Sequence, residues 1–224
     1  MPVDRVILRL EHVKKTYNGQ GKPLKVFEDL NLEVRRGEFL AIFGPTGCGK
    51  TTLLNLIAGF DKPEAGKIYV DGQEITRMPE SRLVELRRKK LGVVFQTNNL
   101  IPSMTVFENV ELPLVLSGVG RSERKKKVEE VLKAFWISNY AERKVATLSV
   151  GECRMVSLAR AMVTDPEIVL LDEPTDFLDA LTVDLMLASL KGKLMQGKTI
   201  IATTHRGRLT KVAERVIRLK KRLP

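Results

Sequence analysis

The segment Gly44–Thr51, GPTGCGKT, is the feature that most constrains how this chain can fold. It fits the pattern G-x-x-x-x-G-K-[S/T] and lies between two apolar runs, EFLAIF and TLLNLIAGF. The first run predicts a buried strand and the second a helix, which is the setting that the pattern requires. Glycines let backbone N–H groups turn inward around phosphates. We therefore expect an α/β fold that binds a nucleotide between a strand and a helix.

The residues of this loop have separate expected roles. Lys50 is expected to reach the β- and γ-phosphates, and the Thr51 hydroxyl is expected to ligate Mg²⁺. Cys48 is expected to be a small residue of the loop and not a redox site. The candidate nucleotide-binding residues are Gly44, Pro45, Thr46, Gly47, Cys48, Gly49, Lys50, Thr51 and Thr52.

A second motif is the apolar run IVLL at residues 168–171, which is followed by Asp172 and Glu173. The run predicts a central strand, and ligands of open parallel sheets lie at the carboxyl ends of the strands. Asp172 is expected to hold Mg²⁺ through water, and Glu173 is expected to polarise the attacking water. Such an acidic pair is common by itself and gains its meaning here from the phosphate loop.

Two further polar residues end predicted strands. Gln96 follows GVVF and His205 follows TIIATT. At the same sheet edge they could sense the γ-phosphate, Mg²⁺ or the attacking water. The alternative is a structural role, which is the commoner one for a lone histidine. We expect catalytic roles for both residues, and magnesium ligation for Gln96.

The patterns divide the chain into an α/β core and a helical insertion. Strand-like runs and a hairpin turn at Asp71-Gly72 come before residue 96, and α/β alternation returns after residue 160. We expect a mainly parallel sheet, an N-terminal antiparallel β subdomain and a helical subdomain. The expected division of the single domain 1–224 is a nucleotide-binding core (1–96 and 161–224) and a helical subdomain (97–160).

Capping patterns predict where three helices begin or end. Ser149, followed by Glu152, forms a capping box before a helical run. Helix N-termini of this kind also bind phosphate, so the stretch is a candidate nucleotide contact as well as a helix start. Ser122 is expected to cap another helix, and Gly197 to end a helix that carries Leu181, Leu185 and Ala188.

The composition bounds the partners of the chain. Its 224 residues carry a formal net charge of +11, which favours anionic partners, with a solvated basic surface as the alternative. Two cysteines, Cys48 and Cys153, form no metal or disulfide pattern. We expect no leader segment, and the sequence contains no apolar run near the roughly 20 residues that span a bilayer. We expect a cytoplasmic protein that reaches a membrane through another chain.

Together, the motifs resemble the ATP-binding subunit of an ATP-binding-cassette (ABC) transporter, and the resemblance covers nearly the whole chain. The resemblance implies a P-loop ATPase that uses ATP and Mg²⁺. The motifs stand in the family's order: the loop at 44–51, Gln96, the LSxGE signature at 148–152, Asp172-Glu173, Leu178-Asp179 and His205.

The resemblance also implies a head-to-tail dimer that sandwiches two ATP molecules. A second copy of this chain is the expected partner, with a different ABC ATPase subunit as the alternative. Tyr17 falls where the family stacks an aromatic ring on adenine, although a core tyrosine is the alternative. Asp179 falls in the loop that links the two sites. The residues expected to contact ATP on the opposite subunit are Ser149, Val150, Gly151 and Glu152.

Two departures from the family pattern lie in the signature helix. Val150 stands where glycine is usual, and its side chain needs room beside the partner's nucleotide, so we expect a weakened contact. Cys153-Arg154-Met155 stands where Gln-Gln-Arg is usual. The arginine is therefore moved by one position, about 100° around the helix.

A finer resemblance lies in residues 91–114, which are similar to the lipoprotein-release, macrolide-export and cell-division subgroup. The implied partner is a membrane-spanning permease that docks just after Gln96, at the cytoplasmic face of the membrane. Four apolar residues there would form a docking groove or belong to the core: Leu100, Ile101, Met104 and Phe107.

Four functions stay open at this point. The first is an ATPase that powers transport, and the second is an ATPase that transmits a mechanical signal to a membrane partner without moving a solute. The third, suggested by Val150, is a regulatory nucleotide binder with low turnover. The fourth is a nucleic-acid ATPase. The charge permits the fourth, but the chain lacks a long coiled-coil insertion or a second cassette, so no specific nucleic acid is expected.

Overall fold

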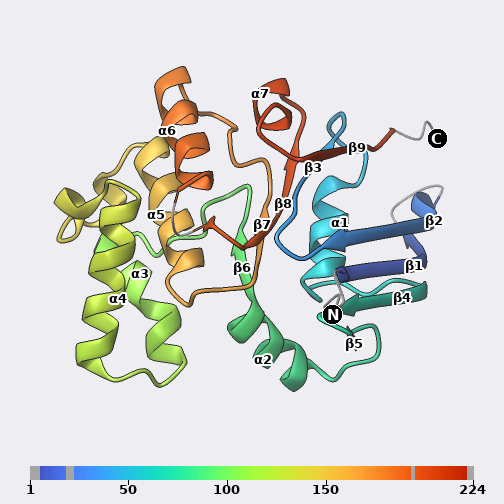
Figure 1. The fold of residues 1–224 in the computed structure, drawn as a ribbon, viewed down its shortest axis with the longest axis horizontal. Coiled ribbons are helices and arrows are strands. Elements are labelled where there is room, and N and C mark those ends of the chain that lie inside the picture. Colours follow the sequence, from blue (N-terminus) through green and yellow to red (C-terminus); the bar gives the residue numbers. More distant parts are fainter. Residues whose placement is uncertain (1–5, 19–22, 193–194, 221–224) are drawn as a thin grey trace. The chain divides into compact units, whose positions relative to one another are not determined.

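The structure is a computed structural model that describes residues 6–18, 23–192 and 195–220. The chain divides into two compact units, one of Met1–Arg87 with Thr199–Pro224 and one of Arg88–Lys198. Figure 1 shows the helices and strands of each unit. The helix α2 (Glu80–Lys90) crosses the boundary between them in sequence. The expected core and helical subdomain stay a prediction.

The N-terminal part of the first unit is an antiparallel sheet, as the strand-like runs predict. Its spatial order is β2-β1-β4-β5. The turn between β4 and β5 is Asp71-Gly72, with φ of 49° and 75°, the left-handed conformation of a two-residue hairpin turn. The strands are β1 (Val6–Tyr17), β2 (Leu24–Arg35), β4 (Ala65–Val70) and β5 (Gln73–Glu74).

The same unit contains parallel strands, and these position the phosphate loop. The strand β3 (Phe39–Phe43) lies between β8 (Thr199–Thr204) and β9 (Arg215–Arg218), parallel to both. Every residue of β8 is buried, its threonines included, so the strand has no exposed face and its sequence shows no regular alternation of apolar and polar residues. The helix α1 (Lys50–Ile57) follows β3 and packs against β4 and β8 (Figure 1), and a short helix, α7 (Gly207–Thr210), follows β8.

The second unit combines two parallel strands with a group of helices. The strand β6 (Leu91–Val94) pairs with β7 (Ile168–Leu171). The helix α3 packs against α4 and α5, and α5 also packs against β6. The helices are α3 (Val106–Leu116), α4 (Arg121–Ala134), α5 (Val150–Met162) and α6 (Ala180–Leu190), with 3₁₀ turns η1 (Ser138–Tyr140) and η2 (Val145–Thr147).

Two capping predictions are wrong. Ser122 lies inside α4, because the extended backbone of Gly120 (φ −62°, ψ 148°) provides the N-cap and the helix begins one residue later. The helix α6 ends at Leu190 with Lys191 as its C-cap, so Gly197 does not terminate it. Gly197 has φ 75° and lies in the turn before β8.

The apolar pattern of α6 also differs from its buried face. Leu181 is 70% exposed and Leu185 is 44% exposed, although both are apolar residues of the predicted helix. Ala188 is exposed as well. The buried positions of α6 are Val183, Met186, Ser189 and Leu190.

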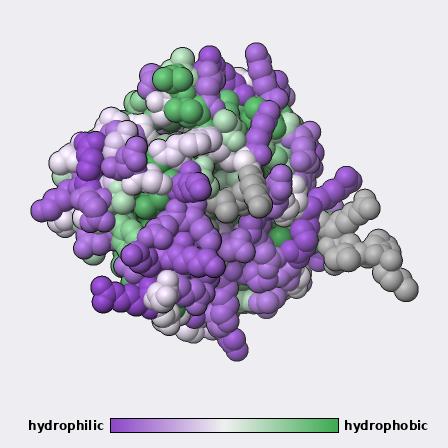
Figure 2. Space-filling model, turned by 60° about the vertical axis from the view of Figure 1, so that its left-hand side comes forward, coloured by the Kyte–Doolittle hydropathy of each residue, from purple (hydrophilic) through white to green (hydrophobic). Residues whose placement is uncertain are grey.

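The surface of the described chain is mostly hydrophilic on the face shown in Figure 2, where hydrophobic side chains form small separate patches. Among the described residues, every helix is too short or too polar to cross a bilayer.

Candidate functional site

The phosphate loop begins where β3 ends. Phe43 pairs with Thr204 in the parallel register, and the Gly44 amide donates a hydrogen bond to the Thr204 carbonyl at 3.1 Å. The loop then leads into α1 through Gly49, whose φ is 98°. A Cβ at Gly49 would lie 2.5 Å from Cγ1 of Val26, so both conformation and space require glycine there.

Lys50 holds this loop together from inside. Its ammonium donates to the carbonyl of Gly44 at 2.7 Å and to the carbonyl of Pro45 at 3.0 Å, and the residue is 6% exposed. Thr51, exposed, and Thr52, half-buried, follow in the first turn of α1. Free N–H groups and the helix dipole favour an anion at such a helix N-terminus.

Tyr17 has polar partners that sequence reasoning missed. The residue is 39% exposed, and its hydroxyl donates to the Asp61 carboxylate at 2.7 Å. The buried Lys15 ammonium donates to the other oxygen of Asp61 at 2.6 Å and lies 4.7 Å from the ring centroid. Burial and the Asp61 hydrogen bond raise the pKa of the Tyr17 hydroxyl. The available signal was Lys15 itself, a cation at an inward position of an alternating strand.

His205 lies at the expected sheet edge. It follows Thr204, the last residue of β8, and its side chain is exposed. Because Thr204 pairs with Phe43, His205 and Gly44 both start from the carboxyl ends of neighbouring parallel strands. The prediction that His205 and the phosphate loop share an edge is confirmed within this unit.

Gln96 and Asp172 share an edge in the second unit in the same way. Val94 pairs with Leu171, and the Asp172 amide donates to the Val94 carbonyl at 2.9 Å. Asp172 is buried and Gln96, two residues beyond β6, is exposed. The paired strand ends therefore bring an amide side chain and a carboxylate to the same edge.

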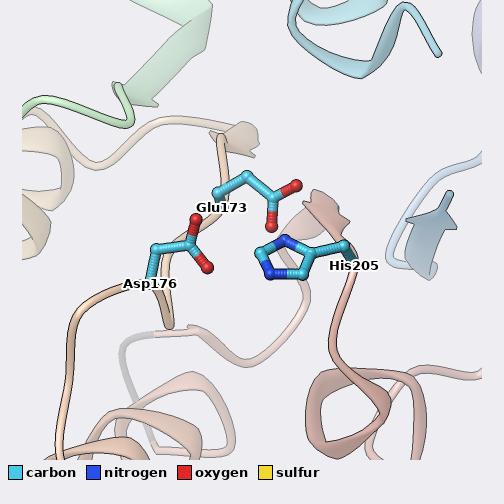
Figure 3. Close-up of side chains that lie close together, drawn as sticks. All are labelled: Glu173, Asp176 and His205. Carbon is cyan, nitrogen blue, oxygen red and sulfur yellow. The ribbon is translucent and has the colours of Figure 1, made fainter. Parts of the chain in front are cut away.

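Glu173 has an unusual backbone for a residue other than glycine. Its φ is 45°, in the left-handed region, and its side chain is only 5% exposed. Residues held in such conformations cluster at functional sites. Figure 3 labels the carboxylates of Glu173 and Asp176, which project from the turn after β7, and the ring of His205, which follows β8 in the first unit.

The signature segment starts α5 as its capping-box pattern predicts. The Glu152 amide donates to the Ser149 hydroxyl at 3.2 Å, and the Ser149 amide donates to the Glu152 carboxylate at 2.7 Å. The backbone hydrogen bond to Glu152 lowers the pKa of its carboxyl. Val150, the first helical residue, is 54% exposed, so its side chain needs no room inside the chain.

Arg154, the arginine that is moved by one position in the signature helix, is buried. It is 1% exposed and donates to the carbonyls of Phe95 at 2.7 Å and Gln96 at 2.8 Å. Burial lowers the pKa of its guanidinium, and the negative charges of Asp176 and Asp172 oppose that shift. The signature helix is thus hydrogen-bonded to the backbone that carries Gln96.

Asp179 is the N-cap of α6. Its carboxylate accepts from the Thr182 amide at 2.9 Å and from the Thr182 hydroxyl at 2.6 Å, and these bonds lower its pKa. Thr182 is also the nearest neighbour of Gly151, where a Cβ would lie 2.9 Å from Cγ2 of Thr182. Thr182, in the first turn of α6, therefore contacts both the signature, at Gly151, and the N-cap residue Asp179.

The apolar residues expected to form a docking groove are all half-buried: Leu100, Ile101, Met104 and Phe107. Phe107 lines a pocket of about 590 Å³ between α3, α4 and the segment after α4. Glu111 and Arg124, joined by a salt bridge at 2.7 Å, line the same pocket. One of the four residues thus opens onto a cavity with charged walls.

The sequence of the chain matches the ABC transporter family over residues 27–176. This match spans more than half of the chain and includes the phosphate loop, Gln96, the signature and the acidic pair. The chain belongs to the ABC transporter family. Its α/β fold with an antiparallel N-terminal sheet and its motifs identify it as an ATP-binding cassette of that family, so the family predicted from the sequence is confirmed.

Solved structures support the assignment. The chain is similar to the dimeric ABC transporter cassette MJ0796, with a TM-score of 0.89 and 38% identity, over 96% of this chain and 94% of the other. The MJ0796 protein of Methanocaldococcus jannaschii is 39% identical over 220 residues, which cover 93% of its length. A second structure of that cassette is a post-hydrolysis dimer bound to ADP and Pi.

Relatives with transporter names align over similar lengths of this chain. The ATP-binding protein LolD of a lipoprotein-releasing system from Chromohalobacter salexigens is 37% identical over 96% of this chain and 92% of its own. The macrolide export ATP-binding/permease protein MacB of Brucella melitensis is 35% identical over 96% of this chain. Only 33% of MacB is covered, so the similarity concerns a part of that protein.

Proposed function

We infer that this chain is the ATP-binding and ATP-hydrolysing subunit of a membrane ABC transporter. The observation that carries the inference is the phosphate loop, closed by Lys50 between a buried strand and α1, in a chain of the ABC family. The MJ0796 cassette, which is similar over nearly its whole length, has been seen after hydrolysis with ADP and Pi.

ATP binds first through its phosphates. The Lys50 ammonium turns from the Gly44 and Pro45 carbonyls toward the β- and γ-phosphates, and backbone N–H groups of the loop and of α1 donate to the phosphate oxygens. The exposed ring of Tyr17 offers a surface on which adenine stacks. Asp61 holds the ring by accepting a hydrogen bond from its hydroxyl, and the Lys15 ammonium lies over one face of the ring.

In the hydrolytic step, water attacks the γ-phosphorus and the bond from that phosphorus to the β–γ bridging oxygen breaks. Glu173 orients the water and accepts its proton, and ADP and phosphate are released. Gln96 and His205 contact the water and the γ-phosphate oxygens, which keeps the reacting atoms in line. The strained backbone of Glu173 supports this role, because strain is retained where geometry matters.

The residues present fit a magnesium ion bound with the ATP. The Thr51 hydroxyl, the Gln96 amide oxygen and the Asp172 carboxylate are hard oxygen donors of the kind that Mg²⁺ prefers, with Asp172 acting through water. When bound, the ion neutralises charge that develops on the β- and γ-phosphate oxygens.

The working unit is a head-to-tail dimer of this chain. In it, Ser149, Val150, Gly151 and Glu152 contact ATP on the opposite subunit, and Asp179 connects the two sites. The exposed position of Val150 at the start of α5 supports a contact with another molecule. ATP closes the dimer and hydrolysis opens it, so γ-phosphate works as a switch.

The subunit acts at the cytoplasmic face of a membrane through a permease. The pocket lined by Phe107, Glu111 and Arg124 receives a cytoplasmic segment of that permease, and its mixed charges suit a polar helix with an apolar anchor. Similarity to LolD and to part of MacB supports a partner of this type.

The test is the ATPase rate of the purified chain and of Glu173→Gln. The variant keeps the shape of the side chain but cannot accept a proton, so it should bind ATP and lose at least about 100-fold in kcat. Glu123→Gln, an exposed change on α4, is the matched control and should keep the full rate. A Glu173→Gln variant with wild-type turnover would refute the proposed chemistry.

A further inference from the structure

We propose that Arg154 is a positioning residue that fixes the backbone of Gln96 for ATP hydrolysis. The proposal rests on the proposed function in one respect, the role of Gln96 at the reacting phosphate. It adds a residue of the signature helix that acts on Gln96 within the same chain. In this proposal Arg154 acts through Gln96 and has no direct contact with the reacting atoms.

The geometry of the guanidinium carries the proposal. Its two terminal nitrogens donate to the consecutive carbonyls of Phe95 and Gln96, at 2.7 and 2.8 Å, across 59 and 58 residues of sequence. The guanidinium is planar and its donors are held in a rigid fork, so two bonds to neighbouring carbonyls fix both the position and the orientation of that peptide. The side chain of Gln96, which is exposed, is thereby attached to a fixed backbone.

The guanidinium of Arg154 is a buried charge that needs compensating partners. Arg154 is 1% exposed, and its Nε has no hydrogen-bond partner among the described residues. A buried cation is stable only with compensating partners, here the two carbonyls and the negative charges of Asp172 and Asp176. Arg154 therefore interacts with two residues of the proposed site. It donates a hydrogen bond to the Gln96 carbonyl, and its positive charge interacts with Asp172, the proposed magnesium ligand.

The same face of α5 makes a second set of contacts farther along the loop. Arg160 donates to the carbonyls of Asn99 at 2.7 Å and Asn98 at 2.9 Å, and Ser157 donates to the Asn98 carbonyl at 3.3 Å. Positions 154, 157 and 160 follow each other at helical spacing. Arg160 therefore offers a matched control, because it binds the loop in the same manner but beyond Gln96.

The experiment is a double-mutant cycle between Arg154→Met and Gln96→Ala, with Arg160→Met as the control. Arg154→Met should lower kcat about tenfold, since a displaced catalytic group loses alignment, and it should change the Kd for Mg-free ATP less than about twofold. Arg160→Met should lower kcat less than about threefold. In the Gln96→Ala background, Arg154→Met should have almost no further effect, because it acts through Gln96.

A second readout needs no nucleotide. Hydrogen exchange of the peptide that spans 91–100 should be faster in Arg154→Met than in the wild-type chain, because two backbone anchors are lost. Unchanged exchange in a folded variant would overturn the proposal. If Arg154→Met does not fold, Arg154→Lys replaces it in the same cycle, because lysine keeps the charge but lacks the forked donors of arginine. Arg154→Lys should show a smaller loss of kcat, and this loss should also vanish in the Gln96→Ala background.

The outcomes separate the two levels of inference. If Gln96→Ala lowers kcat and Arg154→Met lowers it by the same factor in both backgrounds, the Arg154 proposal is wrong and the role of Gln96 stands. A wild-type kcat in Arg154→Met also overturns the Arg154 proposal alone. If Gln96→Ala leaves kcat unchanged, the proposed role of Gln96 fails, and the role of Arg154 through it fails with it.

Discussion

Ser149 and Glu152 exchange two hydrogen bonds, one at 3.2 Å from the Glu152 amide to the Ser149 hydroxyl and one at 2.7 Å from the Ser149 amide to the Glu152 carboxylate. The signature helix therefore begins at Ser149 by a contact inside its own chain, without a nucleotide. The first helical residue, Val150, points to solvent next to this closed pair. The helix start is observed and the nucleotide contact of the same segment is proposed, and the two can be tested separately.

The pH dependence of stability should reveal this capping box. Hydrogen bonds to Ser149 lower the pKa of the Glu152 carboxyl, so the carboxylate's contribution is complete above the ordinary glutamate pKa of about 4.3 and is lost as pH falls through the lowered value. Glu152→Gln keeps the acceptor but removes the charge. The difference in free energy of unfolding between the two chains should be about 0.5 kcal/mol at pH 6 and shrink below pH about 4. A difference that stays constant from pH 6 to 3 contradicts this account.

Gly151→Ala should destabilise the fold through Thr182. The new Cβ would lie 2.9 Å from Cγ2 and 3.2 Å from Oγ1 of Thr182, so we expect a loss of about 1 to 3 kcal/mol in urea unfolding. Thr182→Ser removes Cγ2 and keeps the hydroxyl that donates to Asp179. The double variant should therefore recover part of the loss, whereas strictly additive effects would show that the close contact is not the cause.

Val150→Gly should strengthen the contact between subunits. The change removes an exposed side chain at the first position of α5 and should lower the free energy of unfolding by no more than about 1 kcal/mol. We expect several-fold faster ATP turnover at low protein concentration, with Val150→Ala in between, because less bulk faces the partner's nucleotide. If all three chains turn over ATP at the same rate at every concentration, Val150 does not weaken the contact.

Lys50→Met should affect binding and stability together. It removes a charge that we propose binds phosphates, and it leaves the carbonyls of Gly44 and Pro45 without their buried donor. We expect at least a tenfold loss of ATP affinity by isothermal calorimetry and about 1 to 3 kcal/mol lower stability. Lys67→Met, an exposed change on β4, is the control and should alter neither quantity. Wild-type affinity in Lys50→Met would exclude its proposed role.

The sequence predicts correctly those features that depend on interactions between residues close together in the chain. The Asp71-Gly72 hairpin turn and the capping box at Ser149 depend on residues that are neighbours in sequence, and both are confirmed. The strand ends that carry Asp172 and His205 are also confirmed; the fully buried β7 is a continuous apolar run, and β8 is rich in the β-branched residues that favour strands. The ABC family was predicted from the order of the phosphate loop, the signature and the acidic pair along the chain.

What the sequence did not predict depends on contacts between distant segments. Arg154 bonds to a carbonyl 59 residues away, and Lys15 bonds to Asp61 across 46 residues. Leu181 has the apolar side chain of a core residue but lies on the open side of α6, because packing and not composition selects the buried face. These contacts are visible only once the chain is folded.

The most direct test of the central claim is the solution mass of Glu173→Gln with and without ATP, measured by light scattering. A cassette that binds ATP between two copies and opens by hydrolysis should be a monomer without nucleotide and a dimer with ATP when hydrolysis is blocked. A dimer that forms with ATP and not with ADP is the predicted result. If Glu173→Gln binds ATP tightly and stays a monomer at every concentration measured, this chain does not work as an ATP-driven homodimer.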